Sequence, residues 1–413
     1  MNKNEKRTNE KPLYATIYGM RIVYICHTRF PTEKAHGRQM AEVCAAMGDL
    51  GHDVTLLAPT VHTPIKQSAP SYYGVPDNFQ VKKLKTFDAL HSKLVPMPLA
   101  FLFGMRSYRK ALGQFLASET FDLLYCRSHA VLPPLLASGA KVIVELHTLP
   151  RSKKRAFAWL CNRCERVICL TTPMRDELVK WGVDAAKIII EGDAVDEKAF
   201  MDQKPLSSEQ PVIGYVGSLV ARNTLEKGVA HLVEALALLK KAGVSVRGMI
   251  VGGPDDWKKK YEQRAADLSL TEADLIFTGR VAASDVPAML KTCDVFIYPA
   301  PASKHPYFMR DTSPLKIFEY MAAGRPIISA DLPTICDVLD ESTALFCKAG
   351  DGHDLARAIR DTISDPDAAN KRAAAARQKV EEHTWRKRME RILLKVTDRV
   401  VTGQQVTGRK LTC

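Results

Sequence analysis

Short apolar runs alternate with helical patterns twice along this chain of 413 residues, and this alternation constrains the fold more than any other feature. The run RIVYIC at 21–26 is continuously apolar, which is typical of a strand buried on both faces of a parallel sheet. Between it and a second strand at 52–59, apolar residues from Met40 to Leu50 recur at helical spacing. Further strands are predicted at 121–126, 141–146 and 166–171, and then at 211–219, 246–253, 275–279, 294–300 and 325–330.

The restart of the pattern at 211 predicts an α/β protein with two doubly wound Rossmann-like domains. A hydrophobic content of 46% in a chain of this length suits two separate cores. The last long helix is expected at about 366–400, basic and amphipathic at its end. We expect a flexible extension at 1–19, an N-terminal domain at 20–200, a C-terminal domain at 201–385, and a terminal helix and tail at 386–413 that packs on the first domain.

The net charge of +13 indicates an anionic partner. Residues 1–19 lack the apolar segment of a signal peptide, and the longest nearly apolar run, 94–105, is too short to span a bilayer. The stretch 82–110 combines seven basic residues with the apolar sequence FLF, which suits an anionic lipid surface as well as a merely solvated helix face. We therefore expect a cytoplasmic protein, for which contact with the inner face of a membrane and a solvated helix face are the two alternatives at this stretch.

Two carboxylates bracket the segment DTSPLKIFE, Asp311 at its start and Glu319 within the apolar run that follows. Gly324 and Pro326 then end this run. By themselves, Asp311 is explained as a residue near a helix N-terminus and Glu319 as a surface carboxylate. The flanking sequences DVFIYP and YMAAGRP favour a more specific interpretation.

With these flanks, the segment resembles the nucleotide-sugar half of retaining family-4 glycosyltransferases of the GT-B fold. Their hallmark is an acid, seven residues and a glutamate, and Asp311 and Glu319 occupy these places. The resemblance implies that Glu319 accepts hydrogen bonds from the donor ribose, while Asp311 contacts the donor sugar. A vicinal diol satisfies both oxygens of a carboxylate whose burial is otherwise costly. The family's first acid is usually Glu, so Asp311 is shorter by one methylene.

The segment YVGSL…EKG at 215–228 resembles the family's VGRL…KG, in which the lysine neutralises the donor diphosphate. Lys227 fits this role. Ser218 replaces the family's usual arginine, and Arg222 is the candidate to substitute for it. The resemblance also places Ser313, Pro314 and Leu315 at the sugar and phosphate, where a helix begins, and Val281 at the turn that frames the base.

Two residues of the first series match the family less specifically. Gly37 lies in the loop after the first strand, where a glycine lets the backbone approach the donor phosphate. His147 ends the predicted strand in VELHTLP, and the resemblance implies that it faces the reacting carbon. A satisfied histidine at a strand end explains the same position.

The resemblance implies a glycosyltransferase that moves a hexose from a nucleoside-diphosphate sugar to a glycan, lipid-linked or other hydroxyl acceptor with retention, in a cleft between two domains. No Asp-x-Asp pair accompanies the site, so we expect no metal, with cations in its place, and no cofactor, because the donor is a substrate. No nucleic-acid partner is expected. The alternatives are a nucleotide-sugar epimerase of GT-B architecture and a non-catalytic scaffold that binds glycan or nucleic acid. The sequence names neither sugar, base nor acceptor.

Overall fold

The structure is a computed structural model and describes residues 19–88, 96–196, 198, 205–206, 209–222 and 224–397. The chain folds into two compact units. One runs to Glu145 and also takes in Trp159–Val167 and the segment from Met389; the other takes in Leu146–Ala158 and Ile168–Arg388. The predicted extension lies, apart from Gly19, outside the described residues, as does the tail after Thr397.

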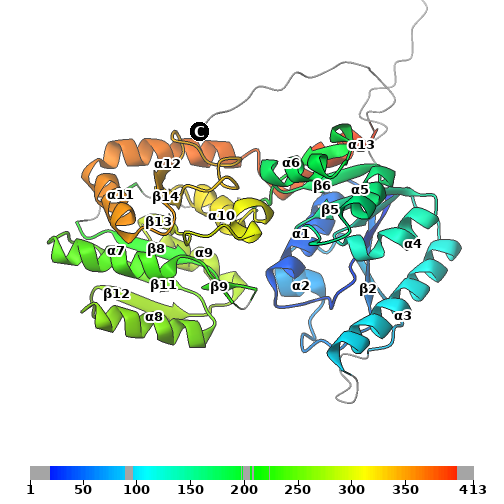
Figure 1. Ribbon diagram of the computed structural model, residues 1–413, viewed down its shortest axis with the longest axis horizontal. Helices are drawn as coiled ribbons and strands as arrows, with labels where there is room; N and C mark the ends of the chain where they lie inside the picture. The colour runs from blue at the N-terminus through cyan, green and yellow to red at the C-terminus, as the bar shows by residue number, and fades with distance from the viewer. Residues whose placement is uncertain are drawn as a thin grey trace, which may run out of the picture. The chain divides into compact units, whose positions relative to one another are not determined.

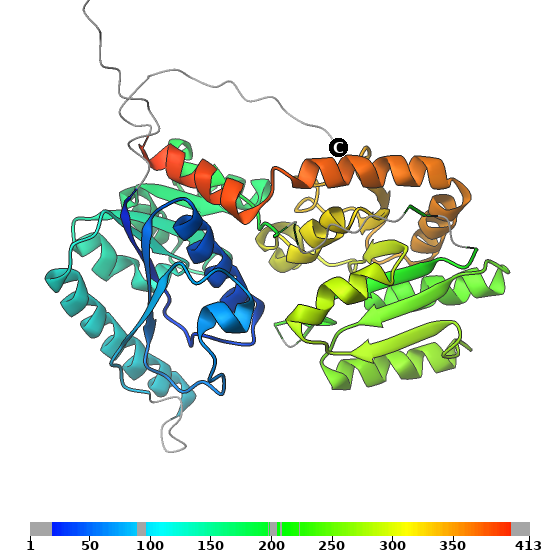
Figure 2. The ribbon, with the colours of Figure 1, turned by 180° about the vertical axis from the view of Figure 1, so that it is seen from behind.

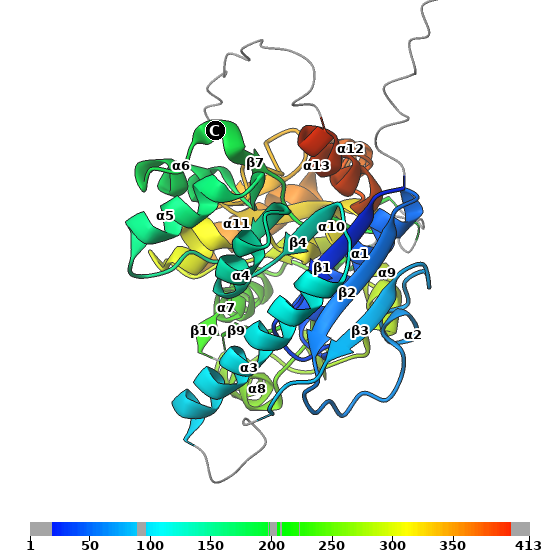
Figure 3. The same cartoon turned by 90° about the vertical axis from the view of Figure 1, so that its right-hand side faces the viewer.

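The first sheet has seven strands in the order β3-β2-β1-β4-β5-β6-β7. Strand β1 pairs in parallel with β2 on one side and with β4 on the other, as Figure 3 shows, so the strand order reverses beside β1. The sequence did not predict β3, because this edge strand, QVKKL, is largely exposed and polar. The strands are β1 Arg21–Ile25, β2 Asp53–Pro59, β3 Gln80–Leu84, β4 Leu123–Cys126, β5 Lys141–Leu146, β6 Arg166–Cys169 and β7 Ile188–Ile190.

The second sheet has six strands in the order β12-β11-β8-β13-β14-β15, and every neighbouring pair is parallel. Its order reverses between β8 and β13. A two-stranded antiparallel hairpin, β9–β10, follows β8. The strands are β8 Val212–Val216, β9 Val220–Ala221, β10 Leu225–Glu226, β11 Arg247–Val251, β12 Leu275–Gly279, β13 Val295–Tyr298, β14 Ile327–Ala330 and β15 Leu345–Cys347.

Helices connect the strands in both sheets (Figure 1). In the first half these are α1 Ala35–Asp49, α2 Ala69–Tyr73, α3 Met97–Ser118, α4 Leu132–Ala137, α5 Lys154–Arg163 and α6 Thr172–Lys180, with 3-10 turns at His129–Val131 and Ala185–Lys187. In the second they are α7 Val229–Lys241, α8 Asp255–Asp267, α9 Val286–Lys291, α10 Leu315–Ala323, α11 Gly352–Ser364, α12 Pro366–Val380 and α13 Trp385–Thr397, with a 3-10 turn at Ala283–Asp285 and a π-helical turn at Tyr307–Asp311.

The second sheet is buried on both faces, as its continuous apolar strands predict. Along β13, Val295 and Ile297 belong to the core shared with α7, α8 and α11, whereas Phe296 and Tyr298 belong to the core shared with α9, α10 and α12. Helix α10 is almost wholly buried and ends at Gly324, whose left-handed φ of 64° caps it. This burial holds the segment that precedes α10 in place.

The single long helix expected at about 366–400 was wrong, because the segment forms two helices. Helix α12 ends at Val380, and α13 begins at Trp385 (orange and red in Figure 2). Between them Thr384 forms a β-bridge with Val195, whose amide donates to the His383 carbonyl, so contacts distant in sequence interrupt the helix. Helix α13 contacts α1, which confirms that the last helix returns to the N-terminal part. Among the described residues, no helix is both long and apolar enough to cross a bilayer.

Candidate functional site

The candidate residues of the second half gather where the order of the second sheet reverses. Gly217 follows β8 directly, and the chain that leaves β13 leads to the turn Tyr307–Asp311 and then to α10. In open parallel sheets, ligands bind outside the carboxyl ends of the strands at this point of reversal. The topology therefore places the candidate site at the ends of β8 and β13.

Gly228 brings the segment that carries Lys227 against the chain leaving β13. Its φ is +85°, and a Cβ at this position would lie 2.5 Å from the Ala300 nitrogen. Only glycine tolerates both this backbone conformation and this close approach. The backbone contact positions Lys227 at the segment that ends in Asp311.

Tyr307 has two cations at its ring. The guanidinium of Arg222 lies 5.8 Å from the ring centroid, and the ammonium of Lys227 lies 6.0 Å from it. Arg222 has a φ of +51°, which is uncommon for a residue with a side chain and occurs here in the turn between β9 and β10. The two cations that the sequence singled out thus lie at one aromatic ring.

Asp311 is 6% exposed and is held by two arginines. The Nε of Arg310 donates to its Oδ1 at 2.6 Å, and Nη2 of Arg222 lies 3.9 Å from its Oδ2. A carboxylate so deeply buried is stable only when it is paired, and Arg310 makes the shorter of the two contacts. Asp311 is the last residue of the π-helical turn rather than a residue of α10.

The start of α10 involves the three residues predicted there. Ser313 is buried, and its Oγ accepts from the Asp193 amide at 2.9 Å. Pro314 is the N-cap residue and Leu315 the first helical residue, and no side chain caps the helix. Uncapped backbone amides at a helix start favour an anion. Ser313 therefore holds the segment in place. The backbone amides at the start of α10 can still bind an anion, as the resemblance implies.

Glu319 is half-buried on α10, one turn after Lys316. Residues three apart on a helix lie on the same side, and the Glu319 carboxylate acts to raise the pKa of Lys316. Val281, two residues after β12, is partly buried and packs on the core that includes α10. The ribose and base roles of Glu319 and Val281 stay predictions.

Sequence reasoning missed Lys316. Its Nζ lies 3.8 Å from the centroid of the Tyr215 ring, is buried, and has no hydrogen-bond partner within the described part of the chain. Burial, and then the charge of Lys227, hold the pKa of Lys316 well below its ordinary value near 10.5, while Glu319 opposes this shift. The only signal in the sequence was one lysine in a helix that is otherwise apolar except for Glu319 and the hydroxyl of Tyr320.

Sequence reasoning also missed Glu226, whose carboxylate caps the start of α7. Its carboxylate accepts from the Gly228 amide at 2.7 Å and the Ala230 amide at 3.2 Å, and the Tyr261 hydroxyl donates to it at 2.7 Å. These amides are therefore already satisfied. At the start of α7, the Lys227 side chain therefore offers a ligand positive charge, whereas the Gly228 and Ala230 amides are already occupied by Glu226.

His147 follows β5 directly and is half-buried. Its imidazole and the Asp193 carboxylate offer atoms within 4.8 Å of each other, and the Asp193 amide is the group that Ser313 binds. Asp193 therefore has its carboxylate near His147 and its amide bonded to Ser313, which lies two residues after Asp311. Whether His147 faces the reacting carbon stays a prediction.

Gly37 is the third residue of α1 and is buried. A Cβ at this position would overlap the Tyr73 hydroxyl, which donates to the Thr32 carbonyl and accepts from the Thr32 amide, each at 2.7 Å. The packing of Tyr73 is therefore reason enough for a glycine. Its contact with a donor phosphate stays a prediction.

Together, two Rossmann-like sheets and a charged site at a point of strand reversal define a nucleotide-binding α/β protein of the GT-B type. Two family models match the chain, Glycosyltransferase Family 4 over residues 36–197 and Glycosyl transferases group 1 over residues 210–365. The chain therefore belongs to the family-4, group 1 glycosyltransferases.

Individual relatives are distant. Glycogen synthase of Mycobacterium tuberculosis is 26% identical over 237 residues, which span 56% of this chain and 53% of that protein. Phosphatidyl-myo-inositol mannosyltransferase of Mycolicibacterium smegmatis is 24% identical over 387 residues, 89% of this chain and 90% of that protein. Among solved structures, Anabaena HepE in complex with UDP and glucose has a TM-score of 0.66 at 17% identity and covers 90% of this chain and 98% of its own. That likeness shows the fold alone.

Proposed function

We propose that the protein transfers a hexosyl group from a nucleoside-diphosphate sugar to an acceptor hydroxyl with retention of the anomeric configuration. The observation that carries this proposal is the gathering of Arg222, Lys227 and Asp311 at Tyr307, beside the uncapped start of α10. Two cations and free amides suit a diphosphate, and a buried carboxylate suits sugar hydroxyls. Membership of a glycosyltransferase family supports the same reaction.

In the proposed reaction, the bond between the anomeric carbon and the β-phosphate oxygen breaks, and its electron pair leaves with the nucleoside diphosphate. The acceptor oxygen bonds to the anomeric carbon on the same face and loses its proton, which the departing phosphate oxygen takes. Negative charge therefore grows on the diphosphate in the transition state. Lys227 and Arg222 stabilise this charge without a metal ion, because preorganised cations need no reorganisation during the reaction.

His147 and Asp311 are proposed to hold the hexose. Asp311 is fixed by Arg310 and keeps Oδ2 toward Arg222, so it accepts from a sugar hydroxyl without leaving its place. His147 is proposed to orient the sugar ring, with the Asp193 carboxylate beside the imidazole. Positioning of this kind lowers the barrier because the reacting atoms meet without a further search.

The direct test incubates the purified protein with radiolabelled UDP-glucose, UDP-galactose, UDP-N-acetylglucosamine and GDP-mannose, with and without an acceptor extract. Slow release of nucleoside diphosphate and free sugar without acceptor, and faster release with it, supports a transferase. Release of an epimerised sugar that no acceptor captures would instead indicate an epimerase. Binding of glycan with no turnover of any donor would indicate a scaffold.

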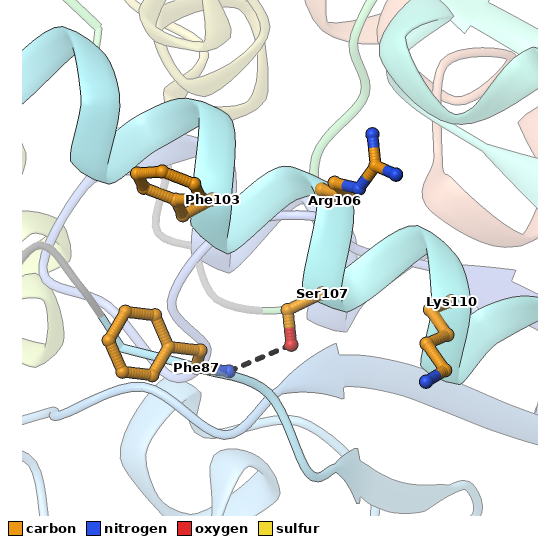
Figure 4. A pocket seen from close by; sticks show the side chains of 5 residues that line it. All are labelled: Phe87, Phe103, Arg106, Ser107 and Lys110. Atoms are coloured by element: carbon orange, nitrogen blue, oxygen red, sulfur yellow. Dashed lines mark hydrogen bonds between the residues drawn. The ribbon is translucent and has the colours of Figure 1, made fainter.

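For the acceptor, we propose a molecule held at an anionic lipid surface. A hollow of about 830 Å³ is lined by Phe87, Phe103, Arg106, Ser107 and Lys110, where the Phe87 amide donates to the Ser107 hydroxyl at 2.9 Å (Figure 4). The side chains of Leu102 and Phe103 are 61% and 54% exposed on α3. Apolar side chains beside cations suit the interface of an anionic membrane.

The relatives are compatible with this acceptor class and with others. The mannosyltransferase aligned over 90% of its length is named for phosphatidyl-myo-inositol, whereas the partly aligned glycogen synthase is named for a polysaccharide. The exposed apolar side chains of α3 favour the lipid surface, because inserting them into a membrane interface removes them from water. Sedimentation with vesicles, argued in the Discussion, distinguishes the two.

A further inference from the structure

We propose that Lys316 binds the donor diphosphate as the second cation beside Lys227, in the place of the arginine that Ser218 replaces. The inference rests on the proposed function and assigns a diphosphate-binding residue to it. Lys316 is on α10, whereas Ser218 follows β8, so the same charge would reach the ligand from a different element.

The side chain of Lys316 points toward the end of β8. Its side chain lies along Tyr215, with Nζ 3.8 Å from the ring centroid, and continues toward the end of β8. A Cβ at Gly217 would lie 2.6 Å from this Nζ. With a φ of +149°, Gly217 leaves the space that the ammonium occupies. The lysine therefore ends at the residue before Ser218, at the point of strand reversal where ligands bind.

The Lys316 ammonium also lacks an acceptor among the described residues, and an anionic ligand would supply one. Its Nζ is buried and donates no hydrogen bond to any residue that the structure describes. Its neighbours are the rings of Tyr215 and Tyr298, the Lys227 ammonium and the Glu319 carboxylate. A buried ammonium without a hydrogen-bond acceptor is costly, and a second ammonium nearby adds repulsion. A diphosphate would supply acceptors to both lysines and remove that repulsion.

Ser218 itself cannot supply the charge. Its Oγ donates to the Val220 carbonyl at 2.7 Å, and its own carbonyl accepts from the Tyr215 hydroxyl at 2.6 Å. Ser218 thus shapes the turn into the β9–β10 hairpin. Because Ser218 carries no charge, another residue must neutralise the negative charge of the diphosphate.

The test replaces Lys316 with Met, which has a similar volume and no charge, and measures binding of UDP, GDP and inorganic pyrophosphate by calorimetry. We expect pyrophosphate and the preferred nucleoside diphosphate to bind about 10- to 100-fold more weakly, the loss of one charge-assisted interaction. Uridine or guanosine should bind as before. Lys371→Met, at an exposed lysine of α12, is the control and should change none of these affinities.

Two further measurements separate the role from a merely structural one. Because Met removes a buried charge without an acceptor, Lys316→Met should leave the Tm unchanged or raised. Adding Ser218→Arg, at an exposed position, should then restore much of the lost pyrophosphate affinity. A restored affinity places both residues at one phosphate site. A lowered Tm with undiminished affinity would overturn the assignment.

Proton uptake tests the wild-type protein directly. An anion favours the ammonium form of Lys316, so nucleoside-diphosphate binding, measured over a pH series above the terminal phosphate pKa of about 6, should draw a proton from the buffer wherever free Lys316 is deprotonated. Calorimetry in two buffers of different ionisation enthalpy measures this uptake, which Lys316→Met should abolish. No uptake, together with equal affinity in Lys316→Met, sinks the Lys316 assignment alone. If neither nucleoside diphosphate nor pyrophosphate binds the wild type, both this inference and the proposed function fail.

Discussion

The Nη2 of Arg222 lies 3.9 Å from Oδ2 of Asp311, so a guanidinium whose side chain is 40% exposed faces a carboxylate whose side chain is 4% exposed. Arg310 satisfies the other oxygen of Asp311 at 2.6 Å. Arg222 is therefore not required to bury Asp311, and its exposed part stays available to a ligand. Replacing Arg222 should therefore affect donor binding more than the stability of the fold.

Arg222→Met should weaken binding of the nucleoside diphosphate by about 1–2 kcal/mol, since it removes a cation from the site. The free energy of unfolding should change by less than about 1 kcal/mol, because Arg310 still pairs with Asp311 and the Arg222 side chain is itself 40% exposed. Calorimetry and urea titration measure the two effects. Arg264→Met, at a similarly exposed paired arginine of α8, is the control. Equal nucleotide affinity in both variants would remove Arg222 from the site.

Lys227→Ala should lower both turnover and diphosphate affinity, while the affinity for the nucleoside stays nearly intact. Glu226 already satisfies the amides at the start of α7, so no backbone charge replaces the missing ammonium. Comparing the dissociation constants of the nucleoside and its diphosphate checks this. Equal losses for both ligands would mean that Lys227 acts on folding.

Glu319→Gln should weaken nucleoside-diphosphate binding by roughly 1.5–3 kcal/mol, the contribution of a charge-assisted pair of hydrogen bonds to the ribose. Inorganic pyrophosphate, which has no ribose, should bind the variant about as well as the wild type. Glu381→Gln, at an exposed glutamate after α12, serves as the control. A parallel loss for pyrophosphate would mean that Glu319 acts through Lys316 and not on the ribose.

The fold could be predicted where runs of apolar residues indicate which elements are buried. The strands at Lys141–Leu146 and Leu275–Gly279 match their predicted ranges because both are apolar runs with clear ends. Edge strand β3 depends on contacts distant in sequence, whereas the break between α12 and α13 combines such a contact with a local one, the Thr384 hydroxyl that accepts from the Lys387 amide.

The candidate site divides in the same way. The spacing of Asp311 and Glu319 is visible in the sequence, as is the glycine after Lys227. The burial of Lys316 under Tyr215 and the capping role of Glu226 depend on which side of each element meets its neighbour. Neither could be deduced from residue types, because an isolated lysine or glutamate is ordinarily solvated.

Activity should survive EDTA, because the proposed charge stabilisation uses Lys227 and Arg222. The experiment matters because His147 and Asp193 offer side-chain atoms within 4.8 Å of each other, and both residue types bind divalent ions elsewhere. Turnover is measured after chelation and after addition of Mg²⁺ or Mn²⁺. If chelation abolishes turnover and a divalent ion restores it, the cation-only account of the leaving group is wrong.

The protein should sediment with vesicles that contain anionic lipid and not with neutral ones. Each basic residue near such a surface contributes about 1 kcal/mol, and the exposed Leu102 and Phe103 add apolar contact. Raising the salt concentration should release much of the protein, because salt screens these charges.

Two variants test which part of this surface acts. Arg106→Glu with Lys110→Glu should weaken sedimentation more at low salt than at high salt, because these exposed cations line the hollow of Figure 4. Leu102→Ser with Phe103→Ser should weaken it at every salt concentration. Val179→Ser with Leu268→Ser, at exposed apolar residues elsewhere, is the matched control, and nucleotide binding should be unchanged throughout. If the wild type ignores anionic vesicles at low salt, the α3 surface is a solvated face, and a soluble acceptor becomes the better proposal.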